Sequence, residues 1–368
     1  MKILPWAGNA VFPALCEALL AWRKSAPDTR DLPWRDEPTP YHVWISEIML
    51  QQTRAAVVRG YYLRFLNALP SVRDLAEADN DALMKLWQGL GYYSRARNLK
   101  RAAEIIVREH GGQMPNDFNA LLTLPGVGRY TASAIASFAY GQPRPAVDGN
   151  FLRVAARVTA NPIDIAKDAS KRALDAALAP SYPSGRDAGL LNEAFMDLGA
   201  TVCLPNGAPL CHTCPAARLC LAHDRGTEQD YPIKSALKPR RKENRTVLLL
   251  SCGEHIAIRK RPAKGLLAAL WEYPNVDGKL SRRAVRAHLE AEGFEVCDIF
   301  PLPPARHIFS HIEWELTGWA ITVADTNESP LMAAEKIESA QPPLLWVRRE
   351  ELAERYSIPA AFGYFTPQ

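Results

Sequence analysis

Four of the seven cysteines of this chain lie within one short segment. The cluster consists of Cys203, Cys211, Cys214 and Cys220. The other three are scattered singly and are expected to be small buried side chains. Because the N-terminal residues do not resemble a secretory signal, the cluster favours a metal site over a disulfide framework. Four thiolates suit a [4Fe–4S] cluster and equally a tetrahedral zinc ion, so the residues alone leave both open.

Two carboxylates lie in sequence environments of different polarity. Glu47 belongs to a helical pattern, beside an apolar stripe that includes Trp44. Partial removal from water there would raise its pKa and keep a proton available for general acid catalysis. Asp148 precedes Asn150 at a helix entrance, where aspartate is a favoured N-cap. A solvated helix edge and a simple cap are the structural alternatives, but such a pair can also supply an acid and an anion to one reaction.

The stretch LPGVGRYTA, residues 124–132, places glycines at the start of a helix. Unpaired N–H groups and the positive end of the dipole allow a helix start to hold an anion. Gly126 and Gly128 leave room for a phosphate to approach those amides. With the helix predicted around residues 117–124, the stretch favours a helix–hairpin–helix, which grips a DNA backbone without reading bases. An ordinary glycine-containing turn is the alternative.

The elements that position these groups are helical over residues 12–222. Segments 79–90 and 94–112 are clear amphipathic helices, the first capped by Asp79 or Asn80 and the second ended by Gly111 and Gly112. Residues 225–243 are basic, contain prolines and lack an apolar period. Strand patterns at 246–251, 255–260 and 312–323, with a helix at 281–293, predict a smaller α+β domain. We therefore expect a helical domain at 1–224, a basic linker at 225–243 and a second domain at 244–368.

Composition limits the class of protein. A chain of 368 residues is long enough for two domains. The net charge of +4 is small, so affinity for nucleic acid must come from local clusters, such as Lys238 and its basic neighbours in the linker. No apolar run approaches the roughly 20 residues that a membrane span needs. We expect a cytoplasmic protein without membrane contact.

Taken together, these motifs resemble the helix–hairpin–helix DNA glycosylase superfamily that includes endonuclease III. The turn at 124–132, the stretch PAVDGNFLRVAAR and the clustered cysteines carry this resemblance. LPWR, TPYHVWISEIMLQQT, LWQGLGYYSRARNL and NEAFMDLGATVC are more narrowly similar to adenine DNA glycosylases of the MutY type. The resemblance implies a multidomain protein: an all-α glycosylase domain with an iron–sulfur cluster, followed by an α+β Nudix-like domain.

The resemblance also implies an activity, the excision of adenine opposite 8-oxoguanine or guanine in double-stranded DNA by a monomeric enzyme. Glu47 would protonate adenine N7, Asp148 would stabilise or transiently bond to the anomeric carbon, and Asn150 would assist in positioning. Tyr130 stands where strand-cutting relatives have a Schiff-base lysine, so we expect a monofunctional enzyme with the Tyr130 hydroxyl bonding near Asp148. The implied DNA-binding residues are Arg35 and Glu193 in the adenine pocket, Gln52 and Tyr92 as wedges, and Thr53, Gly126 and Gly128.

The same resemblance favours a structural [4Fe–4S] cluster over zinc. Its departure from the family is the first gap, where seven residues rather than six separate Cys203 from Cys211. In the C-terminal part, GLLAALWEYPNVDG and RRAVRAHLEAEGF resemble a Nudix fold, but the aligned helix retains mainly Glu290. Phosphohydrolase chemistry is therefore not expected. RHIFSHIEWEL matches the loop that senses 8-oxoguanine, through Phe309, Ser310 and His311.

Three alternatives stay open. An endonuclease III-like pyrimidine glycosylase would have lysine at position 130, and both it and a thymine mismatch glycosylase lack such a C-terminal domain. A non-catalytic DNA-binding scaffold would need the hairpin alone, whereas Glu47 and Asp148 indicate catalysis.

Overall fold

The computed structural model describes residues 6, 10–25, 30–236, 239–324 and 343–365, so Lys238 of the predicted linker lies outside the described residues. The chain divides into two compact units. Residues 1–77 and 97–236 form the first, and residues 78–96 and 237–368 form the second. The short segment 78–96 therefore joins the C-terminal part, and an ion pair between Asp81 and Lys260, 3.0 Å apart, helps to hold it there.

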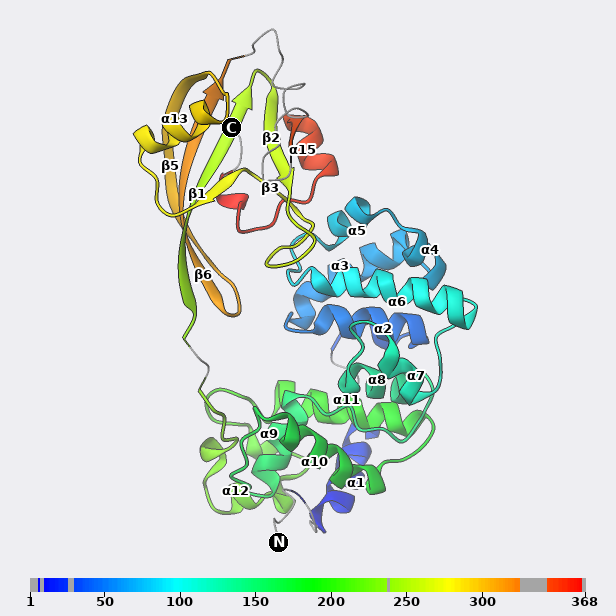
Figure 1. Ribbon diagram of the computed structural model, residues 1–368. Coiled ribbons are helices and arrows are strands. Elements are labelled where there is room, and N and C mark those ends of the chain that lie inside the picture. Colours follow the sequence, from blue (N-terminus) through cyan, green and yellow to red (C-terminus); the bar gives the residue numbers. More distant parts are fainter. Residues whose placement is uncertain (1–5, 7–9, 26–29, 237–238, 325–342, 366–368) are drawn as a thin grey trace. The chain divides into compact units, whose positions relative to one another are not determined.

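The first unit consists of helices (Figure 1). They are α1 (Val11–Ser25), η1 (Pro33–Arg35), α2 (Pro40–Leu50), α3 (Ala55–Ala68), α4 (Val72–Glu77), α6 (Ser94–His110, which begins in the second unit), α7 (Phe118–Thr123), α8 (Arg129–Phe138), α9 (Gly149–Val158), α10 (Asp168–Leu178), η2 (Ala179–Ser181), α11 (Arg186–Thr201), η3 (Cys211–Thr213), η4 (Ala217–Leu219), α12 (Leu221–Asp224) and η5 (Glu228–Asp230). Within its described residues, β structure is confined to an isolated bridge between Asp164 and Ile233. Phe151 of α9 stacks on Phe195 of α11 with ring centroids 4.2 Å apart, at the centre of one apolar core. The all-α character predicted for this part is confirmed.

Helices α7 and α8 form the predicted hairpin. Asp117 caps α7 by accepting a hydrogen bond from the Ala120 N–H at 2.8 Å, and Gly128 is the N-cap residue of α8. Gly126 has a left-handed backbone with φ +79°, and a Cβ added there would lie 2.8 Å from Asn98 Cβ. Gly128 has φ −88° and open space around the same position. Gly126 is therefore required by the backbone, whereas Gly128 leaves the helix start accessible.

The second unit contains a mixed sheet with the strand order β3-β2-β1-β6-β5, in which β4 pairs with β1 and β7 with β2. Strands β1 and β6 are parallel, and the other pairs are antiparallel. The elements are α5 (Asn80–Trp87), β1 (Arg241–Cys252), β2 (His255–Lys260), β3 (Trp271–Glu272), β4 (Asn275–Asp277), α13 (Arg282–Ala291), β5 (Val296–Ile308), β6 (Ile312–Val323), β7 (Leu344–Arg348), α15 (Arg349–Arg355) and η6 (Gly363–Phe365).

Helices cover both faces of this sheet (Figure 1). Val247 of β1 packs in a cluster with Leu352 of α15, while the next residue, Leu248, packs in a second cluster with Val285 of α13. Successive side chains of a strand point to opposite faces of the sheet. Because both faces of β1 are covered by helices, the consecutive residues 247–250 of this strand are all apolar. The α+β architecture expected for the C-terminal part is confirmed.

All predicted elements of this unit are present, and the structure adds others, including β3, β4, β7 and α15, that the sequence pattern did not indicate. The strands expected at 246–251, 255–260 and 312–323 are β1, β2 and β6, and the expected helix is α13. The sequence pattern did not indicate β5, which contains Pro301, Pro303 and Pro304. Because β5 is the last strand of the sheet, its outer edge has no ladder that proline could interrupt. Strand β1 also begins at Arg241, inside the segment expected to be a linker.

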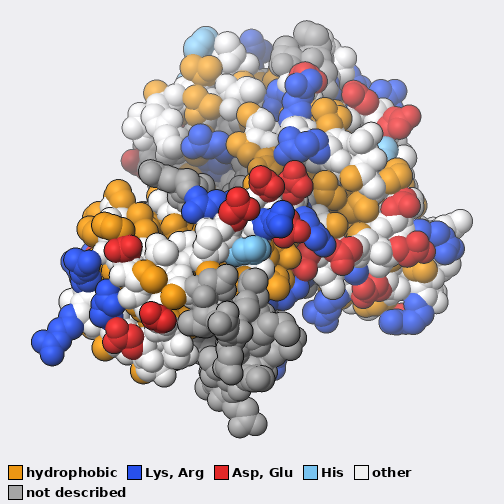
Figure 2. Space-filling model, turned by 90° about the horizontal axis from the view of Figure 1, so that it is seen from above, with side chains coloured by type: hydrophobic (Ala, Val, Ile, Leu, Met, Phe, Trp, Pro, Cys, Tyr) orange, Lys and Arg blue, Asp and Glu red, His pale blue; other side chains and the backbone are white. Residues whose placement is uncertain are grey.

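The face shown in Figure 2 carries Lys and Arg side chains interspersed with Asp and Glu side chains. This distribution agrees with the small net charge of +4. None of the described helices has the length and apolar character to cross a membrane.

Replacing Gly126 with alanine is expected to lower the free energy of unfolding by about 1–3 kcal/mol, because a left-handed residue with a Cβ is strained and here also meets Asn98. Gly128→Ala is the matched control, expected to change it by less than about 0.5 kcal/mol. Urea denaturation of the two variants measures the difference. Equal stabilities would contradict these separate roles.

Candidate active site

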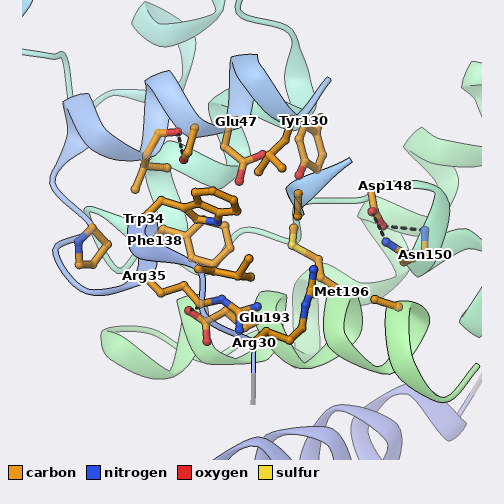
Figure 3. Close-up of a pocket in the computed structure, with 17 residues that line it drawn as sticks. Arg30, Trp34, Arg35, Glu47, Tyr130, Phe138, Asp148, Asn150, Glu193 and Met196 are labelled. Carbon is orange, nitrogen blue, oxygen red and sulfur yellow. Dashed lines mark hydrogen bonds and ion pairs between the residues drawn. The ribbon is translucent and has the colours of Figure 1, made fainter. Parts of the chain in front are cut away.

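A cavity of about 260 Å³ in the first unit gathers side chains from η1, α2, α8, α9 and α11. Its lining includes six residues predicted from the sequence, namely Arg35, Glu47, Tyr130, Asp148, Asn150 and Glu193. In the view of Figure 3, Glu47 and Tyr130 lie together on one wall, while Arg30, Arg35 and Glu193 lie on the opposite wall. The carboxyl groups of Glu47 and Asp148, which are far apart in the sequence, therefore line the same cavity.

Glu47 is held in this cavity by α2, and its residue is only 5% exposed. Its Oε2 atom is buried without a hydrogen-bond partner among the described residues. Burial raises the pKa of Glu47 to about 7, and the charge of Asp148 adds to the increase, while the Tyr130 hydrogen bond and Arg35 oppose it. A large fraction of Glu47 therefore stays protonated near neutral pH, and its Oε2 atom is available to donate a hydrogen bond or a proton.

Tyr130 lies in the first turn of α8, and its hydroxyl is hydrogen-bonded to the carboxyl group of Glu47. Asp148, near which this hydroxyl was expected to bond, acts on Tyr130 through its charge. Burial, followed by the charges of both acids, raises the pKa of Tyr130 well above its ordinary value, so the phenol stays protonated. The reason for the difference is that the Asp148 carboxylate is turned toward the start of α9.

Asp148 is the N-cap residue of α9, as predicted. Its Oδ1 atom accepts hydrogen bonds from the N–H groups of Asn150 and Phe151 at 2.8 and 2.9 Å, and its Oδ2 atom accepts one from Asn150 Nδ2 at 2.7 Å. Burial raises the pKa of Asp148 above its ordinary value, although these hydrogen bonds and the charge of Arg153 oppose the increase. The two carboxyl groups therefore have different environments: the Oε2 atom of Glu47 has no hydrogen-bond partner among the described residues, whereas Asp148 accepts hydrogen bonds from three donors.

Arg153, one turn along α9, connects this cap to the cysteine segment. Its Nη2 atom donates to Asn150 Oδ1 at 2.8 Å and to the Gly199 carbonyl at 2.7 Å, and its Nε atom donates to the Cys203 carbonyl at 2.8 Å. A Cβ added at Gly199 would lie 2.5 Å from Asn150 Cβ. Sequence reasoning missed Arg153 and Gly199. The helical spacing from Asn150 to Arg153 was the available signal.

The opposite end of the cavity is polar and charged. Arg30, Arg35 and Glu193 line it together with the rings of Trp34 and Phe138. Burial raises the pKa of Glu193, and the charges of Arg35 and Arg23 lower it. Arg35 and Glu193 were predicted, whereas Arg30, Trp34 and Phe138 were not. Trp34 directly precedes Arg35 in the LPWR motif, so the prediction of Arg35 as a pocket residue could have indicated Trp34 as well.

The four clustered cysteines line a second cavity of the first unit. Sulfurs around one zinc ion would lie about 3.8 Å apart, given a Zn–S distance of about 2.3 Å. The described donor group in which all atoms lie within 4.8 Å of one another contains Cys211 with His223 and Glu228, but no second cysteine of the four. Arg157 Nη1 donates to Cys203 Sγ at 3.2 Å. The four thiols therefore line one common space, beside the Arg157 guanidinium.

The predicted wedge residues share a backbone feature. Gln52 and Tyr92 have φ +58° and +47°, and they are two of the six described non-glycine residues with positive φ. Such conformations cluster at functional sites because surrounding structure must hold them in place. Gln52 and Thr53 follow α2 in the first unit, whereas Tyr92 belongs to the second unit, where its hydroxyl lies 3.1 Å from Ser310 Oγ.

The segment Phe309–His311 forms the turn between β5 and β6. Ser310 and His311 are exposed, while the Phe309 ring packs edge-on against Trp314 with centroids 4.9 Å apart. The turn is tied to the start of β1, because Arg240 Nε donates to the Phe309 carbonyl at 3.0 Å and the Arg241 N–H donates to the His311 carbonyl at 3.1 Å. The connecting segment therefore supports the predicted recognition turn directly.

Comparisons with known proteins place this chain among DNA repair enzymes. Residues 45–180 match the model for the HhH-GPD superfamily of base excision DNA repair proteins, and residues 245–365 match the model for the NUDIX domain. An adenine DNA glycosylase of Homo sapiens is 35% identical over 384 residues, covering 90% of this chain and 68% of that protein. The one of Mus musculus is 36% identical, covering 85% and 72%. A solved thermostable thymine-DNA glycosylase is 29% identical with a TM-score of 0.51, covering 59% of this chain and 98% of that one.

Substituting Glu47 with glutamine is expected to stabilise the protein at alkaline pH. The folded protein holds the Glu47 proton up to about pH 7, whereas an unfolded chain releases it near pH ~4.3. Between these values the folded state binds more protons, so Glu47 lowers the free energy of unfolding as pH rises. The advantage of Glu47→Gln over the parent should grow by about 2 kcal/mol from pH 5 to pH 8.

Denaturant unfolding at a series of pH values measures this change. Glu104→Gln, at an exposed position of α6, is the matched control and should show no such trend. A constant difference between Glu47→Gln and the parent would contradict a buried, protonated Glu47.

Proposed function

The chain belongs to the adenine DNA glycosylase family, within the HhH-GPD superfamily, and on that basis we propose that it hydrolyses the N-glycosidic bond of adenine paired with 8-oxoguanine or guanine in duplex DNA. The observation that carries this proposal is the cavity shared by Glu47 and Asp148, in which one carboxyl group is protonated and the other is held by three donors. Such a separation supplies an acid and an anion to the same bond.

Glu47 is the proposed general acid. Protonation of adenine N7 withdraws electrons from the glycosidic bond and makes the base a better leaving group. The pKa of about 7 leaves a large fraction of Glu47 protonated at physiological pH and still allows proton transfer. Its Oε2 atom, which has no partner among the described residues, is the proposed proton donor to the adenine, while the hydrogen bond to Tyr130 keeps the carboxyl group in place.

Asp148 is the proposed anion beside the sugar. Loss of the base leaves an oxocarbenium-like sugar, which a nearby carboxylate stabilises or captures transiently. The capping hydrogen bonds favour the ionised form of Asp148 and fix its direction. Asn150 adds a third bond and is the proposed positioning residue for the carboxylate or the attacking water.

The other end of the cavity is the proposed adenine pocket. A flipped base would be enclosed by the Trp34 and Phe138 rings, with Arg35 and Glu193 at its polar edge. Tyr130 stands in the cavity without an amine, so a Schiff base with the sugar cannot form there. We therefore propose a monofunctional enzyme that leaves an intact abasic site.

DNA is held, in this proposal, by backbone amides at the start of α8 and by wedging side chains. The accessible helix start at Gly128 suits a phosphate, and Gln52 and Tyr92 would fill the gap left by the extruded adenine. Exposed Ser310, on the turn secured by Arg240, would contact the opposite 8-oxoguanine.

Cys203, Cys211, Cys214 and Cys220 are the proposed ligands of a [4Fe–4S] cluster. The position of all four cysteines around one cavity supports it, since such a cluster takes one thiolate at each of its irons. When bound, the cluster would supply a rigid crosslink among the segments that carry the cysteines. Arg157 would donate a hydrogen bond to the Cys203 thiolate, and Arg153 would relate that segment to Asn150.

Glu47→Gln and Asp148→Asn are each expected to slow adenine release at least about 100-fold, because each removes one of the two charge-handling groups. Single-turnover assays on duplexes with adenine opposite 8-oxoguanine, guanine or thymine, and on one with thymine opposite guanine, measure the rates. The parent should act on the first two, and Glu104→Gln should match it.

Duplex affinity should change less than about threefold in both variants. Binding by the parent without turnover would favour the non-catalytic scaffold, and release of thymine would favour the mismatch alternative. Borohydride should fail to trap the parent on abasic DNA, since efficient crosslinking requires an amine nucleophile.

The purified protein is expected to be brown and to contain about four iron atoms per chain. Metal analysis with visible absorption measures this, and Cys214→Ser should lose colour and iron together. Cys252→Ser is the control and should retain both, because Cys252 is buried in the second unit. A colourless protein with one zinc ion would contradict the proposed cluster.

A further inference from the structure

Helix α11 presents two acids to the arginines around the proposed adenine pocket. Glu193 lines the cavity, whereas Asp197, one turn along, does not belong to its lining. Asp197 is nevertheless 8% exposed, so its charge is buried beside the cavity rather than solvated. A buried carboxylate is stable only when its charge is compensated by partners, and in turn it fixes the positions of those partners.

Asp197 is hydrogen-bonded to two arginines that line the cavity, and Arg23 Nε lies 3.8 Å from its Oδ2 atom. Arg35 donates through Nη1 to Oδ2 at 3.0 Å and through Nη2 to Oδ1 at 2.8 Å, which makes a two-pronged pair. Arg30 Nη1 donates to Oδ1 at 2.6 Å. Two parallel N–H···O bonds fix the plane of a guanidinium as well as its place. Asp197 therefore orients the donors at the edge of the cavity.

Glu193 is hydrogen-bonded to Arg23, which also lies beside Asp197. Its Oε2 atom accepts from Arg23 Nε at 2.9 Å and from Arg23 Nη2 at 2.7 Å. Its Oε1 atom lies 3.7 Å from Arg35 Nε, beyond hydrogen-bond distance, and can still accept a bond. The cavity thus has an acceptor held by one arginine beside donors held by Asp197.

Fixing both groups matters because purines differ in the order of donor and acceptor along one edge. Adenine presents the N6 amino group as donor and N1 as acceptor, whereas hypoxanthine presents O6 as acceptor and N1–H as donor. A fixed carboxylate beside a fixed guanidinium matches one order, while mobile groups could match either. Leaving a buried polar group unpaired is what makes such discrimination strong.

We propose that Asp197 is a positioning residue that determines base specificity by fixing Arg30 and Arg35 relative to Glu193. The inference rests on the proposed function, because it assigns the edge of the adenine pocket to these side chains. Asp197 itself does not touch the base and acts through the two arginines.

The test compares Asp197→Asn with Asp197→Glu and with Asp187→Asn. The control breaks another ion pair between α1 and α11, Lys24 to Asp187 at 2.7 Å, whose side chains are 49% and 35% exposed. The single-turnover rate constant and the half-saturating protein concentration are measured on duplexes with adenine or hypoxanthine opposite 8-oxoguanine. Asp197→Asn should lower the preference for adenine about tenfold, mainly through a higher half-saturating concentration on the adenine duplex.

Asp197→Glu should recover part of that preference, because it restores the charge, and Asp187→Asn should keep the parental ratio. Affinity for a duplex with an abasic-site analogue should be unchanged in all variants, since no base enters the pocket. Thermal unfolding verifies that each variant is folded.

An unchanged adenine preference in folded Asp197→Asn would overturn the inference. An equal loss of rate on both bases, or a loss of affinity for the abasic duplex, would also overturn it, because either indicates a general structural role. A parent that releases neither base would instead refute the proposed function, so the two failures are distinguishable.

Discussion

The removal of the Glu47 carboxyl group from water is the constraint on which the rest of the first unit depends. A carboxyl group with one oxygen buried and unpartnered cannot carry its charge easily, so it retains a proton that an exposed glutamate would lose. Asp148 shares the cavity but receives three hydrogen bonds at the start of α9. Burial raises the pKa of both acids, but only Asp148 has three hydrogen bonds that favour its ionised form, and such a difference in surroundings suits acid–base chemistry on one bond.

Helix α9 transmits this arrangement through the unit. Its first residues cap onto Asp148, its second turn contributes Arg153, and its third contributes Arg157, so a single face runs from the cavity to the cysteine segment. Both arginines are buried and donate hydrogen bonds to backbone carbonyl groups, so they connect α9 to the neighbouring segments rather than contributing surface charge. The close approach of Gly199 to Asn150 shows how little space separates α11 from the start of α9. Changes in the cysteine segment can therefore alter the position of Asn150 mechanically.

The second unit fixes the turn for which we propose a recognition role. This turn, Phe309–His311, joins β5 to β6 in a mixed sheet with helices on both faces, and the start of β1 pairs with β6 beside it. Packing of Phe309 on Trp314, together with donors from Arg240 and Arg241, fixes the turn while Ser310 stays exposed. The connecting segment therefore belongs partly to the folded unit, because β1 begins within it at Arg241.

The sequence by itself determined what depends on neighbouring residues: the helices and their caps, the glycine hairpin, the strands β1, β2 and β6, and the family motifs that contain Glu47, Asp148 and the cysteines. It missed β3, β4, β7 and β5, and the prolines of β5 are tolerated because that strand lies at an edge. Only the tertiary structure determined that the Tyr130 hydroxyl is hydrogen-bonded to Glu47 and that Arg153 links Asn150 to Cys203. It also determined that Glu193, rather than Asp197, lines the cavity. Glu193 and Asp197 occupy equivalent turns of one amphipathic helix, and only the packing of α1 and η1 against α11 distinguishes them. Burial and charge pairing arise from residues distant in the chain, so local patterns cannot specify them.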